Sequence, residues 1–193
     1  MTKSAAALAA MLALGAAAPA VAAPWVIDRS HAAVTFEVDH LGFSAVHGIF
    51  REFDARIDFD PEAVEETRLS VVIDAASVDT FWAARDEHIR GEDFFDVANH
   101  PEIVFESTSV TPTGAETADV TGELTMIGET REVTFEAVLN RIGPSPFDPE
   151  RTIAGFTVTG EIDRTDWGMD YAAPAVGAAI PIRVDLEMSP AEE

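Results

Sequence analysis

Five histidines are the residues of this chain best suited to acid–base catalysis or to metal binding. They are His31, His40, His47, His88 and His100. Zinc-binding histidines usually come in short, characteristic spacings, and none of the five forms such a pair. His40 and His47 lie in a region of alternating strand pattern, where their separation fixes no shared face. We therefore expect structural histidines with hydrogen-bond partners, no metal site and no catalytic residue.

The other nucleophiles and acids form no catalytic pattern either. Ser44, Ser77 and Ser107 stand outside any Gly-x-Ser-x-Gly sequence, which marks the nucleophile turn of many serine hydrolases. The chain has no cysteine, which excludes thiolate catalysis and cysteine metal sites. Its 35 acidic residues are so numerous that any proposed pair of carboxylates carries little weight. No glycine-rich phosphate loop is present, and we expect no cofactor.

The charge balance of the chain is strongly acidic, with 12 lysines and arginines against 35 aspartates and glutamates and a net charge of −23. Nucleic acids reward basic patches, because these release counterions from the phosphates, and this chain offers none. An anionic membrane surface would repel the chain for the same reason. We therefore expect no nucleic-acid partner, and the charge favours solubility.

Residues 1–22 resemble a secretory signal peptide. Lys3 precedes an apolar run over residues 5–18, and the segment ends in Ala-Val-Ala, a small-x-small cleavage pattern. We expect cleavage after Ala22, which leaves one domain over residues 23–193. The apolar run is alanine-rich and short for a membrane span, and no later segment has the roughly 20 consecutive apolar residues that spanning needs. The sequence thus predicts an exported protein without stable membrane insertion.

Alternation of apolar and polar residues dominates the rest of the chain, as in strands that bury one face. We expect eight strands, the first interrupted early, at residues 28–30. Their ranges are 25–40, 46–59, 67–75, 102–110, 118–126, 131–140, 152–163 and 178–188. In the second strand the apolar phase changes from even to odd positions, which predicts a bulge near Arg51 or Glu52. Residues 127–130 are expected to form the tight link of a hairpin.

Eight strands with a kink in mid-strand favour an all-β fold in the form of an antiparallel barrel, because closure removes the sheet edges. A β-sandwich made of the same strands is the structural alternative. Three long connections, 77–101, 141–151 and 164–177, either rim a barrel mouth or merely join strands. The sequence alone leaves both possibilities open.

The connection 77–101 is expected to hold one short helix. Asp79 or Thr80 can cap a helix that begins near Phe81, and Gly91 supplies a stop. Two consecutive phenylalanines, Phe94 and Phe95, then require burial. This connection therefore places a charged helix and an aromatic pair among strands.

Four segments carry a family resemblance through their order and spacing. They read DRSHAAVTFEVDHLGFSAVHGIF, RDEHIRGEDFFDVANHPEIVFES, GELTMIGETREVTFEA and IDRTDWGM. Together they resemble the pattern of the YceI-like polyisoprenoid-binding family over nearly all of the chain after the signal segment. The resemblance implies a lipocalin-like barrel in the bacterial periplasm, whose apolar interior holds a long isoprenoid lipid.

The interior of such a barrel is either filled by side chains or hollow, and packed interiors are the rule for an arbitrary barrel. The family resemblance favours a hollow interior. The aromatic residues predicted to line it are Phe36, Phe50, Phe53, Trp82, Phe105, Phe135 and Phe156. Apolar burial is non-directional, so a lining of this kind would tolerate lipids of different length.

The head group of the lipid would determine specificity. The residues predicted to hold it are Arg85, His88, Arg90 and Arg164. A prenyl phosphate would need these positive charges, whereas a quinone needs only neutral hydrogen bonds, and the acidity of the chain favours the neutral head group. Alternatively, the helix arginines form surface ion pairs with nearby acidic residues such as Asp86, Glu87 and Glu92.

We therefore expect a periplasmic, non-catalytic lipid carrier for storage or transport in the cell envelope. One rival is a ligandless envelope stress or interaction protein with a filled barrel. Another is an enzyme that acts on an isoprenoid substrate, with His31, His40 or His88 as general base. A homodimer through an exposed strand or loop is compatible with the sequence, although no residue pattern specifies it.

Overall fold

The computed structural model describes residues 24–191, so the predicted signal peptide over residues 1–22 and its cleavage after Ala22 lie outside the described residues. Within this range the chain forms one antiparallel sheet and one α-helix. The strands are β1 (Pro24–Ile27), β2 (Ala33–His40), β3 (Ser44–Phe50), β4 (Phe53–Asp58), β5 (Arg68–Asp74), β6 (Val78–Asp79), β7 (Glu102–Pro112), β8 (Thr117–Met126), β9 (Glu129–Pro144), β10 (Thr152–Asp163) and β11 (Ala179–Pro190). The helix is α1 (Ala83–Arg90), and the 3-10 turns are η1 (Arg29–His31), η2 (Val64–Glu66), η3 (Ala75–Ser77) and η4 (Arg164–Trp167).

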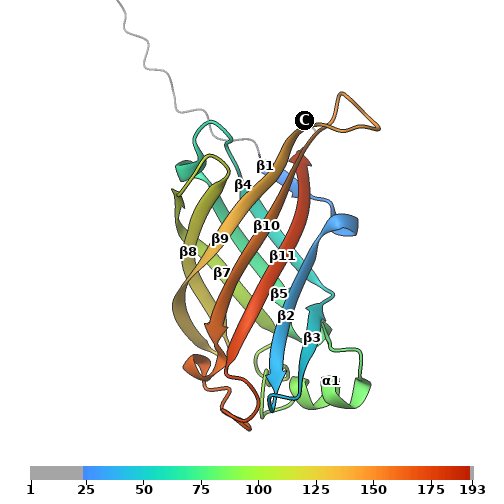
Figure 1. Ribbon diagram of the computed structural model, residues 1–193, viewed down its shortest axis with the longest axis vertical. Helices are drawn as coiled ribbons and strands as arrows, with labels where there is room; N and C mark the ends of the chain where they lie inside the picture. The colour runs from blue at the N-terminus through green and yellow to red at the C-terminus, as the bar shows by residue number, and fades with distance from the viewer. Residues whose placement is uncertain (1–23, 192–193) are drawn as a thin grey trace, which may run out of the picture.

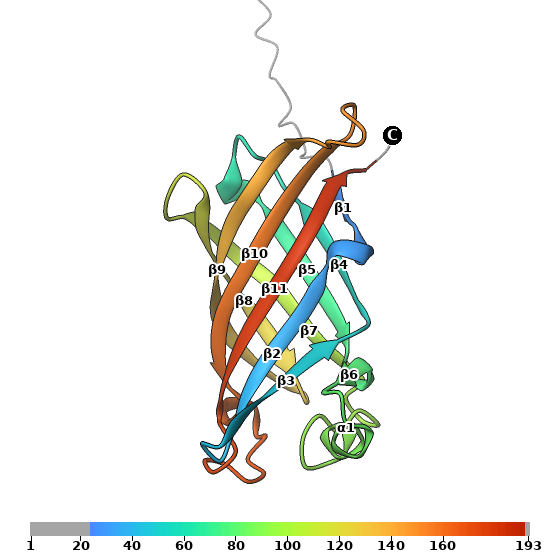
Figure 2. The same cartoon turned by 45° about the vertical axis from the view of Figure 1, so that its right-hand side comes forward.

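The sheet closes into a barrel, as Figures 1 and 2 show. The hydrogen-bonded order runs β1-β4-β5-β7-β8-β9-β10-β11, and β11 pairs back with β1 and with β2. If β1 with β2 and β3 with β4 are counted as the halves of two interrupted strands, the described residues form the predicted barrel of eight strands. The sandwich alternative is wrong, because pairing continues around the whole ring.

Both predicted interruptions are present. Between β1 and β2 lies η1, where the Asp28 carboxylate accepts a hydrogen bond from the Ser30 amide. Between β3 and β4 the ladder breaks at Arg51 and Glu52, so that the chain changes its inward-facing phase there. These two kinks let the first strands bend around the barrel while they keep their apolar residues inside.

The β8–β9 hairpin confirms the predicted tight link. Its two loop residues, Ile127 and Gly128, have φ values of 42° and 81°. Two consecutive positive φ values characterise the type I′ turn, whose twist matches that of the flanking strands. The turn therefore fixes the register of β8 against β9, in which Met126 pairs with Glu129.

The barrel has two distinct ends. One end, which we call the α1 end, carries α1, the β2–β3 turn and residues 164–177 (Figure 1). The opposite end carries both described termini and the β4–β5, β7–β8 and β9–β10 connections. Two of the long connections therefore lie at opposite ends of the barrel, residues 164–177 at the α1 end and residues 141–151 at the other end. Each forms part of the rim at its end.

The helix begins two residues later than predicted, at Ala83, with Trp82 as its N-cap residue. Asp79 does not cap it, because its carboxylate accepts from the Phe81 amide at 2.7 Å. Thr80 instead donates from its amide, at 2.8 Å, and from its hydroxyl to Asp86, which is only 6% exposed. No helix within residues 24–191 is both long enough and apolar enough to cross a membrane.

Candidate functional site

A cavity of about 610 Å³ runs inside the barrel. It is lined by residues from nearly all strands and, at the α1 end, by residues of the connection 77–101. This volume lies within the range of roughly 300–1,000 Å³ that is usual for small-molecule sites. Many inward aliphatic residues remain partly accessible because they border this space, for example Val71, Val158 and Val184. The interior is therefore hollow, as the family resemblance implied.

Six of the seven predicted aromatic residues line the cavity. They are Phe36, Phe50, Phe53, Phe105, Phe135 and Phe156. The placement of Trp82 was wrong, because this residue is 66% exposed and lies outside the cavity lining. As the N-cap residue of α1 it stands at the outer end of the helix, and the strand periodicity that identified the six phenylalanines does not apply there.

Three glycines hold phenylalanine rings against the barrel wall. A Cβ atom at Gly48 would lie 2.2 Å from Phe36 Cζ, and one at Gly160 would lie 2.4 Å from Phe135 Cδ1. A Cβ atom at Gly122 would likewise lie 2.5 Å from Phe105 Cζ. Each ring therefore lies across a glycine of the barrel wall and stays out of the central space. The sequence carried this signal as glycines at inward phases of strands.

The four predicted head-group residues do not all meet. Arg85, His88 and Arg164 line the cavity at the α1 end, whereas Arg90 lies outside the lining. Arg90 instead donates to the backbone carbonyls of Ala76, at 2.7 Å, and Val78, at 2.7 Å. It ties the last turn of α1 to β6, so the expectation of a head-group role for Arg90 is corrected to a structural one.

Arg164 is a buried cation, only 4% exposed, that organises the loop over residues 169–177. Its guanidinium donates to the carbonyl oxygens of Met169, Tyr171, Val176 and Gly177. Burial lowers the pKa of this guanidinium below its ordinary value, although the nearby carboxylates of Asp163 and Asp170 act in the other direction. Carbonyl oxygens therefore occupy most of its donors, and little remains for a phosphate.

Arg85 is engaged in a similar way. Its Nε donates to the Thr80 hydroxyl at 2.7 Å, and its Nη2 donates to the Thr80 carbonyl at 2.5 Å. Within residues 24–191 neither Arg85 nor Arg90 forms a salt bridge. The alternative of surface ion pairs on α1 is therefore wrong, since backbone carbonyls and a threonine replace the acidic partners.

An aromatic group covers this end of the cavity. The His88 ring stacks edge-on against Phe94 and Tyr171, with centroids 5.2 Å and 5.0 Å apart, and His88 Nε2 lies 2.9 Å from Asp93 Oδ2. Phe94 and Tyr171 also line the cavity, although neither was among the predicted ligand residues. Their position in connections, outside any periodic pattern, concealed them from sequence reasoning.

No histidine in the part of the chain that the structure describes has the geometry of a catalytic triad. His31 contacts Ser30 Oγ and Asp28 Oδ2, both at 3.1 Å, through the same atom, Nδ1. A triad needs both ring nitrogens. Hydrogen bonds to the Asp28 carboxylate, the largest contribution coming from the Ser30 hydroxyl, lower the pKa of Asp28 to about 2. The hydrogen bond with the Asp28 carboxylate in turn raises the pKa of His31.

The Asp28 and His31 side chains lie with Glu187 so that one ligand atom from each falls within 4.8 Å of the others. The hydrogen bonds from Ser30 and His31 already account for the position of the Asp28 carboxylate. All three residues also lie outside the cavity lining. Hydrogen bonding therefore explains this cluster, and we assign no metal ion to it.

Comparison with known proteins gives consistent relatives. A UPF0312 protein of Pseudomonas savastanoi pv. phaseolicola is 42% identical over 176 residues, covering 90% of this chain and 91% of its own. A UPF0312 protein of Pseudomonas putida is 43% identical over 171 residues, covering 88% of each chain. A crystal structure of the Campylobacter jejuni YceI protein matches with a TM-score of 0.73 and 28% identity, over 80% of this chain and 90% of that one.

A more distant structure shares the fold. A polyisoprenoid-binding domain from Saccharophagus degradans, implicated in plant cell wall breakdown, matches with a TM-score of 0.63 at 13% identity, over 86% of this chain and 98% of that one. The model of the YceI-like domain matches residues 25–188, which include every strand of the barrel from β2 to β10. This chain therefore belongs to the YceI-like domain family.

Proposed function

We propose that this protein binds a long isoprenoid lipid in its barrel cavity and serves as a non-catalytic carrier in the bacterial periplasm. The observation that carries the proposal is the long, almost wholly apolar cavity, which crosses the barrel from the α1 end to the β4–β5 and β7–β8 connections. Family membership and the polyisoprenoid-binding domain among its structural neighbours support the same ligand class.

The energetics of such a site suit an isoprenoid. Each buried methylene contributes about 0.8 kcal/mol, and the contribution needs no specific geometry. The phenylalanines that lie flat against the wall leave room for a chain along the barrel axis. Binding therefore grows with the length of chain that enters and requires no chemistry from the lining residues.

The polar groups at the α1 end favour a neutral head group over a phosphate. Arg164 uses four hydrogen bonds on protein carbonyls, and Arg85 uses two on Thr80. A bound phosphate would have to compete with these oxygens inside a protein of net charge −23. A carbonyl or hydroxyl group needs only one hydrogen-bond donor and no cation.

The test is to express the full chain with residues 1–22, purify it from the periplasm, and combine native mass spectra with analysis of an organic extract. We expect a co-purifying isoprenoid. Val158→Trp fills the cavity from an inward position and should abolish it, whereas Thr159→Trp, at the next position and outside the lining, should not. Lipid-free protein, even after challenge with prenyl lipids and quinones, would refute the carrier and favour a ligandless envelope protein.

A further inference from the structure

One polar atom of the cavity wall differs from the others because it has no hydrogen-bond partner. Within residues 24–191, Thr67 Oγ1 is the one buried side-chain oxygen or nitrogen that has no hydrogen-bond partner. Thr67 is only 7% exposed and belongs to the cavity lining. A buried hydroxyl without a partner destabilises a folded protein, and such a group calls for an explanation.

The side chain of Thr67 faces the interior. In the strand that follows, Leu69, Val71 and Ile73 line the cavity, and the residues between them do not. Thr67 continues this inward phase by two positions. Its hydroxyl and methyl group share one carbon, so a rotation about χ1 is sufficient to turn the hydroxyl from the wall toward a ligand.

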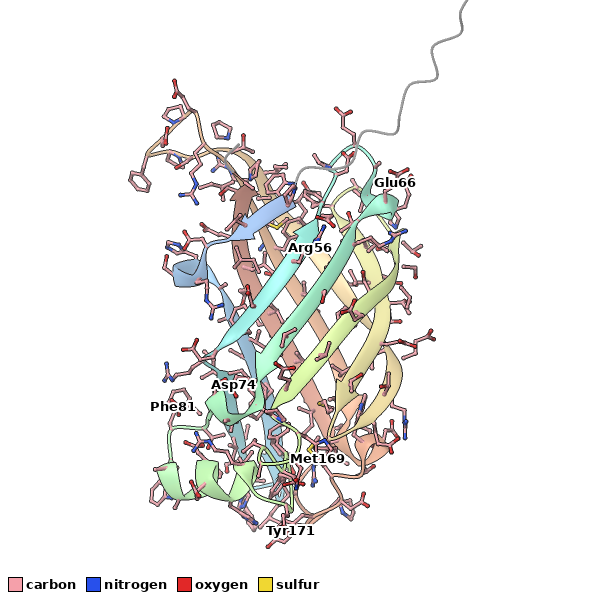
Figure 3. All side chains as sticks on the ribbon, turned by 180° about the vertical axis from the view of Figure 1, so that it is seen from behind. Arg56, Glu66, Asp74, Phe81, Met169 and Tyr171 are labelled. Atoms are coloured by element: carbon pink, nitrogen blue, oxygen red, sulfur yellow. The ribbon has the colours of Figure 1, made fainter. Side chains whose placement is uncertain are left out.

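Thr67 lies at the opposite end of the barrel from the predicted head-group residues. Glu66, its neighbour in η2, lies at the end remote from Tyr171 and Met169, as Figure 3 shows. The cavity reaches this end between the β4–β5 connection, with Pro61 and Val64, and the β7–β8 connection. The cavity therefore has polar groups at both ends and an apolar wall between them.

The surroundings of Thr67 select against a charged anion. Glu116 contributes to the cavity rim at this end, and its carboxylate would repel a phosphate. Arg68 is exposed and donates from Nη1 to the carbonyls of Glu65 and Thr67. It does not belong to the lining, so among residues 24–191 no arginine or lysine lines the cavity at this end; the lining arginines, Arg85 and Arg164, lie at the α1 end.

We propose that Thr67 forms a second polar subsite, at the end remote from α1, whose hydroxyl bonds a neutral oxygen of an isoprenoid, either a hydroxyl or a carbonyl group. The inference rests on the proposed function and adds the place and the charge of the group bound. An isoprenoid with a neutral head group lies with that group at Thr67 and extends its chain toward α1. Binding removes the destabilisation of the unpartnered hydroxyl.

The experiment compares Thr67→Val, which keeps the shape of the side chain and removes the hydroxyl, with Thr67→Ser, which keeps the hydroxyl. Three probes are titrated against lipid-free protein: geranylgeraniol, geranylgeranyl phosphate and squalene. Loss of one neutral hydrogen bond should weaken geranylgeraniol about threefold to tenfold in Thr67→Val. Affinity for squalene, which has no polar atom, should stay the same, and Thr67→Ser should bind all probes like the unchanged protein.

The lipid-free proteins provide an independent readout. Because the hydroxyl has no partner in the empty barrel, Thr67→Val should unfold at the same temperature as the unchanged protein or at a higher one. Equal affinity of Thr67→Val and the unchanged protein for geranylgeraniol would overturn the subsite and leave the carrier function intact. If the unchanged protein binds none of the three probes, the carrier function is refuted, and the subsite with it.

Discussion

The glycine at position 160 offers a direct test of how the cavity is kept open. In Gly160→Ala, the new methyl group would lie 2.4 Å from Cδ1 and 3.0 Å from Cε1 of Phe135. Carbon atoms do not approach so closely, so the phenylalanine ring must leave the wall. The free direction is toward the barrel axis, where the ring would occupy space that belongs to the cavity.

Two opposing contributions determine the change in stability. Overpacking of a well-packed position costs about 1–3 kcal/mol. Replacement of glycine by alanine in an ordinary extended strand returns about 0.4–1 kcal/mol, because the unfolded chain loses freedom. The expected net loss lies between about 0 and 2.6 kcal/mol, with a central value of about 1.3 kcal/mol that for a domain of this size lowers Tm by roughly 3–5 °C.

The assay combines thermal unfolding with displacement of a fluorescent apolar probe from the cavity. Gly155→Ala is the matched control on the same strand, because the nearest atom to its methyl group would be Leu186 O at 3.9 Å. We expect Gly160→Ala to lose both stability and probe affinity, and Gly155→Ala to lose neither. The double variant Gly160→Ala/Phe135→Leu should recover part of both, because the smaller side chain relieves the clash.

A particular outcome would refute this reasoning. If Gly160→Ala unfolds at the temperature of Gly155→Ala and binds the probe equally well, the ring is not held on the wall by the glycine. The hollow interior would then need another physical cause.

Two further predictions concern charged residues. Arg164→Lys should lower the free energy of unfolding by about 3 kcal/mol in urea titrations, because an ammonium group cannot reproduce a planar fork bonded to four carbonyls; an unchanged urea midpoint would contradict this. The ion pair of Asp28 and His31 should stabilise the fold only in a pH window. The Asp28 contribution disappears as pH falls below its unfolded value of about 4 toward 2, and the His31 contribution disappears as pH rises through its raised pKa. His31→Ala should therefore lower Tm at about pH 5 but not at about pH 9, and a constant difference would count against the pair.

The barrel was predictable because every strand buries one face. That requirement imposes alternation, and even the phase change at Arg51 and Glu52 was visible in the sequence. The same alternation identified the inward phenylalanines. Hydrophobic periodicity does not report on side chains in connections, so the exposed position of Trp82 and the place of Tyr171 at the cavity could not be derived.

Hydrogen-bond partners were harder to predict than positions. Asp86 and Arg90 stand four residues apart on a helix, a spacing that favours an ion pair. In the structure Asp86 instead accepts from Thr80, and Arg90 bonds to carbonyls of the preceding segment. Both choices depend on how the chain folds back before the helix, which no local pattern encodes. The hydrogen-bond partners of Arg164 likewise could not be predicted, because they depend on the path of the loop over residues 169–177 that surrounds it.

The barrel wall is built in two different ways, and this difference bears on how quickly a cargo could exchange. Around most of the ring, adjacent strands are joined by continuous ladders, whose separation is cooperative. On the side of β3, only the short β6 continues the sheet, and the wall beyond it consists of α1 and residues 91–101. This part is held by the Arg51–Asp79 ion pair, by the two bonds of Arg90, and by the packing of apolar side chains such as Phe95 against the core. For a ligand that leaves on this side, the residence time would depend on the local free energy of opening this segment, which is a smaller quantity than the free energy of unfolding the whole barrel.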